Sequence, residues 1–420
     1  MGETGQRIGY LGRILPALSE TFVTREITAL RQAGVTVKPF SIFRPDPSSV
    51  HREAEEIQGQ VEVLNRPANP LFWLAHFYFA FRHPRRYFGS LWRYVLASGE
   101  PFRSRMRALQ QFLVAPFAAL RFRRAGVEHI HAHFAHSPGG IAMMAARLLG
   151  ITFSMTIHSY DLYVEKSLLP QKLASAAFIA TVSEYNVRNL TEWYPQETRS
   201  KLHVVRCGVD PEIFVPRPQP RSDKPVILGI GRLVELKGFH TLIEAVAILR
   251  SRGINVQCYI AGEGPEKERL EAMSAQLGLE AGVHLLGKVL QSDLQQYFRR
   301  AAVFALPSCV REYQDNIPVV LIEAMAMEIP VVSTNISAIP ELVRDGSTGL
   351  LVEPENPTQL ADALATLLTE RESAVELGRA ARKLVSDEFN VHVSAGRLKR
   401  LFEACAGVDA AGATADTESQ

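Results

Sequence analysis

Short apolar runs alternate with longer amphipathic segments along most of the chain. Near the N-terminus, "RIGYLG" is predicted to be a buried strand and "VTVKPFSIF" the next one, with a helix between them that begins near Phe22 and is capped by Ser19 or Thr21. The same order returns through "HIHAHF", "GGIAMMAARLLG", "FSMTIH", "AAFIATVS" and "LHVVRCGV". Strands that alternate with helices in this way predict a parallel sheet covered by helices.

A segment rich in proline and charge, "DPEIFVPRPQPRSDKP" at residues 210–225, interrupts this alternation, so we place a domain linker there. A second alternation follows, through "VILGIGRL", "FHTLIEAVAILRSRG", "VQCYIAGEG", "VFALPS" and "PVVST". We therefore expect an α/β fold with two tandem doubly wound, Rossmann-like domains, residues 1–215 and 216–390. The carboxyl ends of both sheets would flank an interdomain cleft, where ligands of α/β proteins usually bind.

The C-terminal residues are expected to contribute little chemistry. A helix over residues 391–406 is predicted to pack back toward the first domain. Residues 407–420 are small and polar enough to form a disordered tail.

Residues from about 66 to 124 depart from the alternation and are predicted to form a helical insertion in the first domain. Aromatic residues there interleave with Arg82, Arg85, Arg86, Arg93, Arg103, Arg105 and Arg107. Basic, aromatic-rich amphipathic helices suit an anionic membrane surface, whereas an ordinary insertion with solvated arginines gives the same pattern, and both interpretations stay open. The longest apolar run, Leu71 to Phe81, is far shorter than the ~20 residues that span a bilayer, so an integral membrane protein is not expected.

Composition narrows the classes of function. The formal net charge of +2 over 420 residues is close to balance, which argues against nucleic acid as the main partner. The cysteines are too scattered for a disulfide scaffold or for CxxC metal spacing; they are Cys207, Cys258, Cys309 and Cys405. The N-terminal residues lack the charged start, apolar run and cleavage site of a signal peptide. We therefore expect a cytoplasmic protein.

Glycines at the start of the second alternation raise the question of a dinucleotide site. Gly229 and Gly231 would let backbone amides approach a phosphate, but Val234 stands where the third glycine of that motif is needed. The next strand ends in "IAGEGP", without an acid at its tip to bind a ribose hydroxyl. A dehydrogenase is therefore disfavoured.

The segment "EHIHAHFAH" holds four histidines, His129, His131, His133 and His136, of which the first three alternate. Alternate residues of a strand share a face, so a zinc site is one interpretation. No cysteine or acid stands nearby at metal-ligand spacing. A strand whose polar end enters the cleft is the simpler interpretation.

Two basic residues and two acids stand out in the second domain. Arg232 and Lys237 lie around a predicted helix N-terminus, where their charges and free backbone amides would bind an anion together. Asp315 and Glu323 are separated by seven residues. Asp315 alone could be a helix cap, but Glu323 interrupts an otherwise apolar helix. Because a buried, unpaired carboxylate costs several kcal/mol, we expect a polar group to meet Glu323.

With these residues the chain resembles the retaining, nucleotide-sugar-dependent glycosyltransferases of family 4, which have the GT-B fold. The resemblance extends over nearly the whole chain. It is close to the branch that builds exopolysaccharide, such as the colanic acid type, in "LPALSETFVTREI" near the start and in "NIPVVLIEAMA" later.

The resemblance assigns roles to individual residues. Arg232 and Lys237 match the residues that bind the donor diphosphate, Asp315 matches the acid that faces the sugar, and Glu323 matches the acid that binds the ribose hydroxyls. The catalytic-cleft histidine matches His158 in "SMTIHSYDLY". The expected catalytic residues are His158, Asp315, Arg232 and Lys237. Further residues expected at the donor are Gly262, Glu263, Gly264, Lys288, Val289, Asn316, Ile317 and Pro318. Those expected on the acceptor side of the first domain are Gly12, Ser19, Glu20, Thr21, His133 and Asp161.

The chain departs from the family pattern at three positions. Asp315 is shorter by one methylene than the usual Glu, while Asn316 and Glu328 stand where glycines are usual. The first two concern contacts to the sugar, and the third concerns the end of a helix.

The resemblance implies retention of anomeric configuration by front-face attack, in which the leaving phosphate oxygen accepts the acceptor's proton. Arg232, Lys237 and helix-end amides would stabilise the developing charge, so no metal, cofactor or carboxylate nucleophile is expected. The expected donor is a UDP- or GDP-sugar. The expected acceptor is a saccharide or a polyprenyl-diphosphate-linked oligosaccharide of exopolysaccharide biosynthesis, and attachment to the inner face of the cell membrane is one option.

Two other functions stay open. The departures at Asp315, Asn316 and Glu328 fit a nucleotide-sugar-binding protein that has lost transfer activity. A GT-B hydrolase or epimerase of nucleotide sugars would use the same donor residues, and only product analysis separates it from a transferase.

Overall fold

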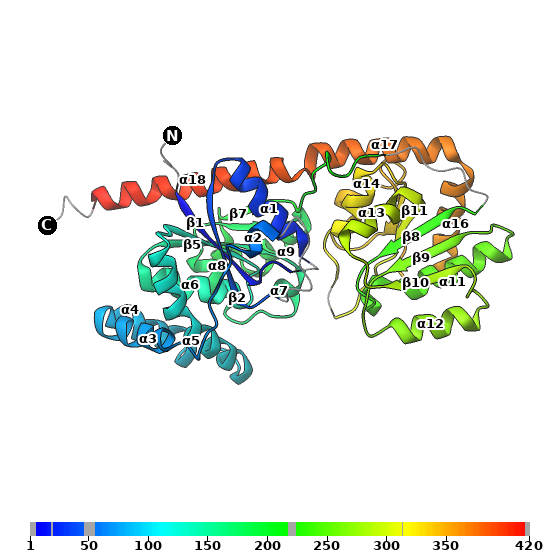
Figure 1. The fold of residues 1–420 in the computed structure, drawn as a ribbon. Helices are drawn as coiled ribbons and strands as arrows, with labels where there is room; N and C mark the ends of the chain where they lie inside the picture. The colour runs from blue at the N-terminus through cyan, green and yellow to red at the C-terminus, as the bar shows by residue number, and fades with distance from the viewer. Residues whose placement is uncertain (1–5, 18–19, 46–54, 217–223, 313, 416–420) are drawn as a thin grey trace. The chain divides into compact units, whose positions relative to one another are not determined.

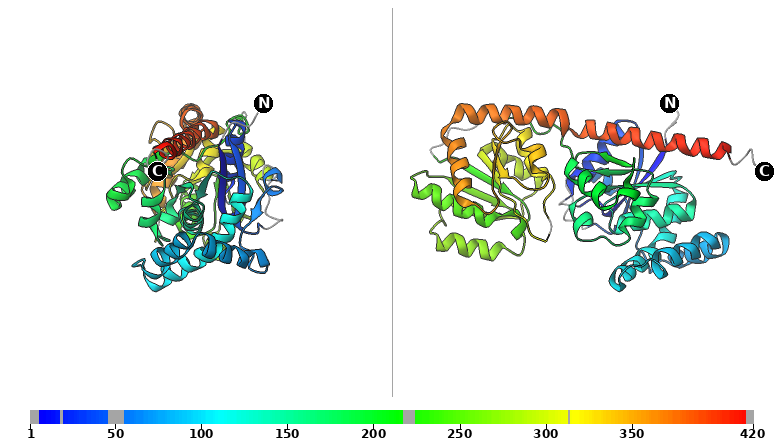
Figure 2. Two further views of the ribbon diagram at one scale, coloured as in Figure 1. Left: turned by 90° about the vertical axis from the view of Figure 1, so that its left-hand side faces the viewer. Right: turned by 180° about the vertical axis from the view of Figure 1, so that it is seen from behind.

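The chain divides into two compact units, Met1–Arg206 with Ser394–Gln420, and Cys207–Val393. The computed structural model describes residues 6–17, 20–45, 55–216, 224–312 and 314–415. Each unit contains one sheet with helices on both of its faces (Figure 1, Figure 2).

The first unit is built on a seven-stranded parallel sheet with the strand order β3-β2-β1-β4-β5-β6-β7. Its strands are β1 (Arg7–Ile14), β2 (Thr36–Phe43), β3 (Glu62–Val63), β4 (His129–His133), β5 (Thr152–Ile157), β6 (Ile179–Thr181) and β7 (Leu202–Val204). The direction of strand succession reverses between β1 and β4. The carboxyl ends of these two strands therefore form the switch point at which ligands of doubly wound folds bind.

The two faces of this sheet are covered differently. Its helices are α1 (Thr21–Gln32), α2 (Glu55–Gln58), α3 (Pro70–Arg82), α4 (Pro84–Leu91), the π-helical turn η3 (Trp92–Leu96), α5 (Phe102–Arg124), α6 (Ser137–Leu149), α7 (Ser159–Tyr163), α8 (Leu169–Ser175), α9 (Glu184–Trp193) and α10 (Pro195–Thr198). Because strand residues alternate, Ile130 and Ala132 of β4 join the apolar core with α5 and α6. His129 and His131 instead face the Phe402 ring of the C-terminal helix α18 (Val391–Ala415), at centroid distances of 5.6 and 5.4 Å.

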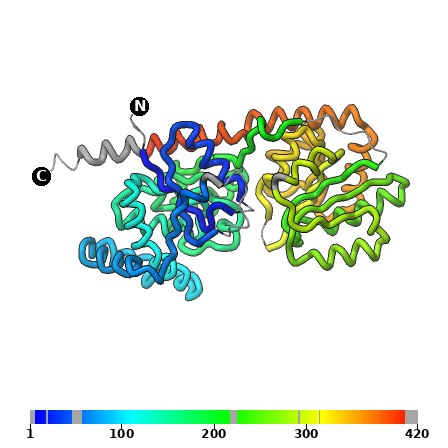
Figure 3. Tube along the Cα trace, in the orientation of Figure 1, coloured from blue at the N-terminus to red at the C-terminus, as the bar shows by residue number. Residues whose placement is uncertain are grey.

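Helix α18 (Val391–Ala415) supplies the C-terminal part of the first unit. Lys399 Nζ donates a hydrogen bond to the carbonyl of Ala33, so α18 lies beside the end of α1 (Figure 3). The helix continues past the end expected at residue 406. Residues 407–415 are helical where a tail was expected, and residues 416–420 lie outside the described part of the chain.

The helices between residues 70 and 124 lie together at one end of the first unit (Figure 1). Helix α3 packs on α5 through Phe72 and Phe117, whose ring centroids are 5.6 Å apart. Among the described residues, no helix is both long enough and apolar enough to cross a membrane.

The second unit repeats the architecture with six parallel strands in the order β10-β9-β8-β11-β12-β13. They are β8 (Val226–Ile230), β9 (Gln257–Ala261), β10 (Val283–Gly287), β11 (Ala301–Leu306), β12 (Val331–Thr334) and β13 (Leu350–Val352). Its helices are the 3-10 turn η4 (Glu235–Lys237), α11 (Phe239–Ser251), α12 (Lys267–Gln276), α13 (Gln291–Arg300), α14 (Val319–Ala326), α15 (Ile339–Leu342), α16 (Pro357–Thr369) and α17 (Arg371–Glu388). The prediction of two doubly wound, Rossmann-like parallel-sheet domains is confirmed, and the switch point here lies between β8 and β11.

Candidate functional site

The loop after β8 packs closely on the loop after β9. Leu233 N–H donates to the carbonyl of Glu263 (2.8 Å), and Gly231 N–H donates to that of Ala261 (3.0 Å). A Cβ atom at Gly262 would lie 1.8 Å from the carbonyl oxygen of Gly231, and one at Gly264 would lie 2.2 Å from that of Leu233. Only glycine allows the two loops to approach this closely.

Lys237 and Asp315 meet at the switch point of the second unit. The ammonium group contacts both carboxylate oxygens, at 3.0 and 2.9 Å, and Ser308 Oγ donates to Oδ2 at 2.7 Å. Lys237 ends the turn after β8, whereas Ser308 and Asp315 follow β11, so two neighbouring strands bring them together. The side chains of Lys237 and Asp315 are only 12% and 15% exposed, which strengthens their attraction relative to a surface pair.

The other residues expected at the donor follow the same edge of the second sheet. Arg232 is exposed on the loop between β8 and η4, and Lys288 and Val289 follow β10. The Gly262 N–H donates to the carbonyl of Gly287 at 2.9 Å, which joins the ends of β9 and β10. Because all six strands are parallel, the loops that carry these residues leave one edge of the sheet.

The segment from Asp315 to Pro318 leads directly into α14, whose first backbone N–H groups have no partner within the helix. Both polar side-chain atoms of Asn316 are buried without a hydrogen-bond partner in the described part of the chain. Glu323 is 3% exposed on α14 and is not without an interaction partner. Glu328, beyond the helix end, has φ of +57°, which explains why glycine is favoured at such a position.

In the first unit, His158 is the last member of a chain of four side chains. Its Nε2 atom lies 2.8 Å from Nε2 of His133, and Nδ1 of His133 lies 2.6 Å from Tyr10 Oη. Tyr10 Oη in turn hydrogen-bonds Oε1 of Glu26 on α1. The residues come from α1, β1, β4 and the start of α7.

Burial controls the charges along this chain. It raises the pKa of Glu26 to about 7, against the opposing effect of the Tyr10 hydrogen bond. It lowers the pKa of His158 to about 3, and burial followed by repulsion from neighbouring histidines lowers that of His133 well below its usual value. Both imidazoles are therefore neutral near pH 7.

Asp161 anchors backbone rather than facing open space. Its carboxylate accepts hydrogen bonds from the N–H groups of Ala135 (2.5 Å) and His158 (2.8 Å), and its side chain is fully buried. Burial raises its pKa to about 7, while these backbone donors act in the opposite direction. Lys172 on α8, also fully buried, donates to the carbonyls of Ala135 and His136 at 2.6 and 3.0 Å. Together these groups fix the loops after β4 and β5.

The remaining residues expected on the acceptor side lie near the end of β1 or at the start of α1. Gly12 is buried on β1, Glu20 precedes α1, and Thr21 is its first residue. Burial raises the pKa of Glu20 to about 7, against the effect of nearby Arg13. Ser19 lies outside the described residues.

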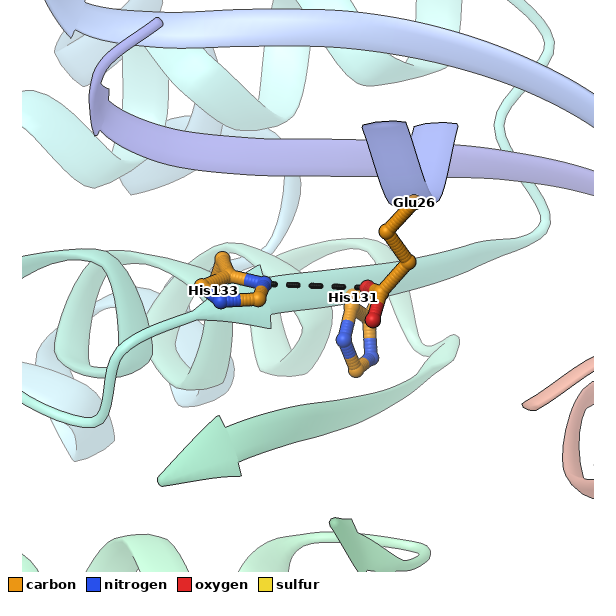
Figure 4. A group of neighbouring side chains, drawn as sticks. All are labelled: Glu26, His131 and His133. Atoms are coloured by element: carbon orange, nitrogen blue, oxygen red, sulfur yellow. Dashed lines mark ion pairs between the residues drawn. The ribbon is translucent and has the colours of Figure 1, made fainter. Parts of the chain in front are cut away.

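Glu26, His131 and His133 each offer one ligand atom within 4.8 Å of the others, a spacing that a metal ion could use (Figure 4). The sequence interpretation found no acid near these histidines because Glu26 is more than 100 positions away in the chain. However, both ring nitrogens of His131 already contact hydroxyls of Ser154 and Thr156, at 2.8 and 3.0 Å. Since His133 is also engaged at both nitrogens, a metal would displace existing hydrogen bonds.

Sequence reasoning missed Tyr10, Glu26, Lys172 and Ser308. A signal existed for Glu26, because it shares the inward face of α1 with Val23, Ile27 and Leu30. A charged residue at a core position of an amphipathic helix indicates a buried polar network. Ser308 carries no comparable signal.

Comparisons with known proteins match both units. The family model "Glycosyltransferase Family 4" matches residues 19–213, and "Glycosyl transferases group 1" matches residues 212–384. The putative colanic acid biosynthesis glycosyltransferase WcaL of Escherichia coli K12 is 29% identical over 95% of this chain and 100% of its own length. The amylovoran biosynthesis glycosyltransferase AmsK of Erwinia amylovora is 36% identical over 48% of this chain and 51% of its own length.

Among solved structures, Anabaena Alr3699/HepE in complex with UDP and glucose is similar, with a TM-score of 0.70 and 19% identity. The similarity covers 95% of this chain and 99% of that one. At this identity it supports the fold.

Proposed function

We propose that this protein retains anomeric configuration and works without a metal in exopolysaccharide assembly. The premise is that the chain belongs to the family 4 glycosyltransferases, which move a sugar from a nucleotide sugar to an acceptor. The observation that carries this proposal is the Lys237–Asp315 pair at the switch point of the second unit. The Lys237 ammonium can bind the diphosphate of a donor, and the adjacent Asp315 carboxylate can accept hydrogen bonds from the sugar hydroxyls of the same donor.

The donor is bound by the second unit. Lys237 and Arg232 neutralise the diphosphate, and the N-terminal amides of α14 add further donors. Asp315 accepts hydrogen bonds from sugar hydroxyls, and Glu323 accepts them from the ribose. Before the donor binds, Asp315 holds the Lys237 ammonium in position, which reduces the cost of ordering that side chain.

The reaction exchanges one bond at the anomeric carbon for another. The bond to the leaving phosphate oxygen breaks, the bond to the acceptor hydroxyl forms on the same face, and the acceptor proton passes to the phosphate oxygen. Charge builds on the leaving diphosphate, and Arg232 with Lys237 stabilises it where it develops. These two cations supply the positive charge that a divalent ion supplies in other transferases.

His158 positions the reacting groups as a neutral imidazole. Its lowered pKa keeps it uncharged near pH 7, so the ring has one nitrogen that donates a hydrogen bond and one that accepts. Glu26 and Asp161 are buried and hydrogen-bonded, so we assign neither as a nucleophile. This agrees with front-face transfer, which needs no covalent intermediate.

The finer assignment of partners follows from the relatives. HepE was solved with UDP and glucose, which makes a UDP-sugar one candidate donor, and a GDP-sugar is the other. WcaL and AmsK are named for exopolysaccharides, so the proposed acceptor is a saccharide or a polyprenyl-diphosphate-linked oligosaccharide. We place the protein at the inner surface of the cell membrane, because exposed apolar residues and arginines share α3 to α5.

Thermal stabilisation by UDP-, GDP-, ADP- and dTDP-sugars, with and without EDTA, tests the donor assignment. One nucleotide class should stabilise the native protein in EDTA, and Lys237→Ala should weaken binding by about tenfold or more. Lys267→Ala, an exposed lysine on α12, is the matched control. Stabilisation that requires a divalent metal, or none by any nucleotide sugar, would contradict the proposal.

Product analysis completes the test. The native protein should give a glycosylated acceptor and free nucleotide, whereas a hydrolase gives free sugar and an epimerase gives an isomeric nucleotide sugar. His158→Ala should lose turnover while its unfolding midpoint stays close to that of the native protein. Full activity in this variant would refute the role of His158.

A further inference from the structure

A cavity of about 540 Å³ lies in the first unit, outside the residues assigned above. The ends of β1 and β2 form one side of it through Arg13 and Phe43, and helices α3 and α5 form another through Trp73 and Arg107. Its size is that of a small-molecule binding site. Part of its wall therefore belongs to the helices that interrupt the βα alternation.

One part of the cavity wall is cationic. Arg13 and Arg107 both line it. Arg13 is near Glu20, which is outside the wall and has a pKa raised to about 7, but within the described part of the chain no ion pair within 4.0 Å involves either arginine. Glu165 is the one carboxylate on the wall, so the two guanidinium groups leave a positive excess. Guanidinium groups bind phosphate oxygens through paired hydrogen bonds, which makes a phosphate or diphosphate a suitable ligand here.

A buried amide also lines the cavity. Gln111 is 3% exposed, and its Oε1 atom has no hydrogen-bond partner in the described part of the chain. An acceptor left unpaired in the interior is costly, so a donor from water or a ligand is expected at this atom. This observation is independent of the arginines and also indicates a polar ligand group.

The rest of the wall is apolar and continues to the protein surface. Ile42, Phe43 and Phe72 line the cavity, and Trp73, which also lines it, is 49% exposed. Beyond Trp73 on α3, Leu74 and Phe77 are exposed too. A hydrocarbon chain attached to a group inside the cavity would remain on apolar surface along this route.

We propose that this cavity binds an anionic amphiphile, with its diphosphate on Arg13 and Arg107 and its hydrocarbon chain on Phe43, Phe72 and Trp73. The inference rests on the proposed function, since it identifies this amphiphile as the lipid-linked acceptor of the transferase. Ser137, also on the cavity wall, follows His136, whose ring stacks on Phe134. The Phe134 ring is 4.6 Å from that of His158, so a sugar attached to the diphosphate would extend toward His158.

Titration calorimetry of the full chain with decyl diphosphate tests the proposal. Decyl diphosphate should bind at least about tenfold more tightly than inorganic pyrophosphate or neutral decyl maltoside, because only it offers both the charge and the chain. Equal binding of pyrophosphate would show a site for the anion alone and overturn the amphiphile assignment. Equal binding of decyl maltoside would show an apolar site alone and overturn it as well.

Two pairs of variants locate the site. Arg107→Gln and Gln110→Trp, both at the cavity, should weaken decyl diphosphate binding by about tenfold or more, the first by removing charge and the second by filling space. Arg103→Gln and Met106→Trp change exposed residues of the same helix outside the cavity wall and should leave binding unchanged. Unchanged binding in both cavity variants would refute the site.

Binding of the nucleotide sugar is measured on the same samples. A protein that binds the nucleotide sugar but not decyl diphosphate would overturn the cavity assignment and leave the transferase proposal intact. Decyl diphosphate binding that is lost in Arg107→Gln while nucleotide-sugar binding is retained would support the cavity assignment. Loss of nucleotide-sugar binding alone would count against the donor site and not against the cavity.

Discussion

At the residue scale, the hydrogen bonds from Glu26 to His158 link the proton on one group to the tautomer of another. When Glu26 is ionised, Tyr10 donates to it, Nδ1–H of His133 donates to Tyr10, and Nε2–H of His158 donates to His133. When Glu26 is protonated, every donor in the chain reverses. His158 then carries its proton on Nδ1, so the state of Glu26 decides which ring nitrogen of His158 is protonated.

We predict that Glu26→Gln flattens the pH dependence of kcat around pH 7, because the carboxyl with a pKa of about 7 is replaced by a group that does not titrate. The turnover at the optimum should change by less than about tenfold, since Glu26 acts through His158 and does not touch the substrate. The measurement is a kcat profile from pH 6 to 8. Tyr10→Phe breaks the next link and should flatten the profile in the same way. If both variants keep the native profile, the chain does not control His158.

Several residues of the proposed donor site stand out in the sequence because they break a local pattern. Arg232 and Lys237 stand at a strand end, and Glu323 interrupts an apolar helix. The contact between Lys237 and Asp315 could not be predicted from such patterns, because 78 positions separate the two residues. Tyr10 was missed for the same reason, since its neighbour His133 lies on another strand, whereas the core position of Glu26 on α1 was a signal that went unused.

At the scale of elements, β4 concentrates buried histidines that are neutral in the folded protein. Burial lowers the pKa of His129 to about 3 and that of His131 well below its usual value. The pKa values of His133, His136 and His158 are also lowered, and burial is the main cause for each. In the unfolded chain these groups titrate near ~6.5, so below that pH the unfolded state binds more protons.

We predict that the free energy of unfolding falls as the pH is lowered from 7 to 5. The five buried histidines named above, whose pKa values are lowered furthest, favour the unfolded state in this range, and His76, His83 and His203 add to this in the same direction. Glu20, Glu26 and Asp161, with pKa values raised to about 7, favour the folded state. Among these strongly shifted groups the histidines exceed the carboxyls by two protons (5 − 3), so the loss should be on the order of 1–3 kcal/mol. Denaturant unfolding at both pH values measures it. A midpoint that rises or stays constant toward pH 5 would mean that the histidines are not buried as described.

The order and type of most elements could be predicted from the sequence, because parallel strands buried on both faces produce short apolar runs such as "VILGI" of β8. The C-terminal end of α18 could not be predicted from the sequence. Its last residues are small and polar, a composition typical of a tail, and yet they continue the helix to Ala415. The amphipathic pattern that marks a packed helix is absent there, so the sequence carried no boundary signal.

At the scale of the whole molecule, a nearly balanced net charge hides an uneven distribution. Glu100 is the only acidic residue between positions 66 and 124, where arginines are frequent. On α3, Phe72 and Phe79 are buried, while Phe77 and Phe81 on its outer side are 61% and 83% exposed. A helix that is apolar on its outer side as well indicates a binding partner for that side.

We predict that the protein binds vesicles that contain phosphatidylglycerol more tightly than vesicles of phosphatidylcholine alone, and that added salt weakens the binding. Replacing Phe77 and Phe81 by serine should lower the affinity by about tenfold, because their apolar area no longer leaves water. Vesicle flotation measures both effects. The control replaces Ile213 and Val215, exposed residues of the second unit, by serine and should bind as the native protein does. If the native protein binds neither kind of vesicle, the membrane assignment is wrong.

The return of α18 to the first unit sets an order of events during synthesis. Residues 1–206 leave the ribosome first, but the rings of His129, His131 and Phe178 receive their cover only when Phe402 arrives. Nascent chains usually complete domains from the N-terminus onward. Here the unit that starts first is completed last, after every residue of the second unit has been translated. A stop codon shortly after residue 390 would therefore damage the beginning of the protein as much as its end.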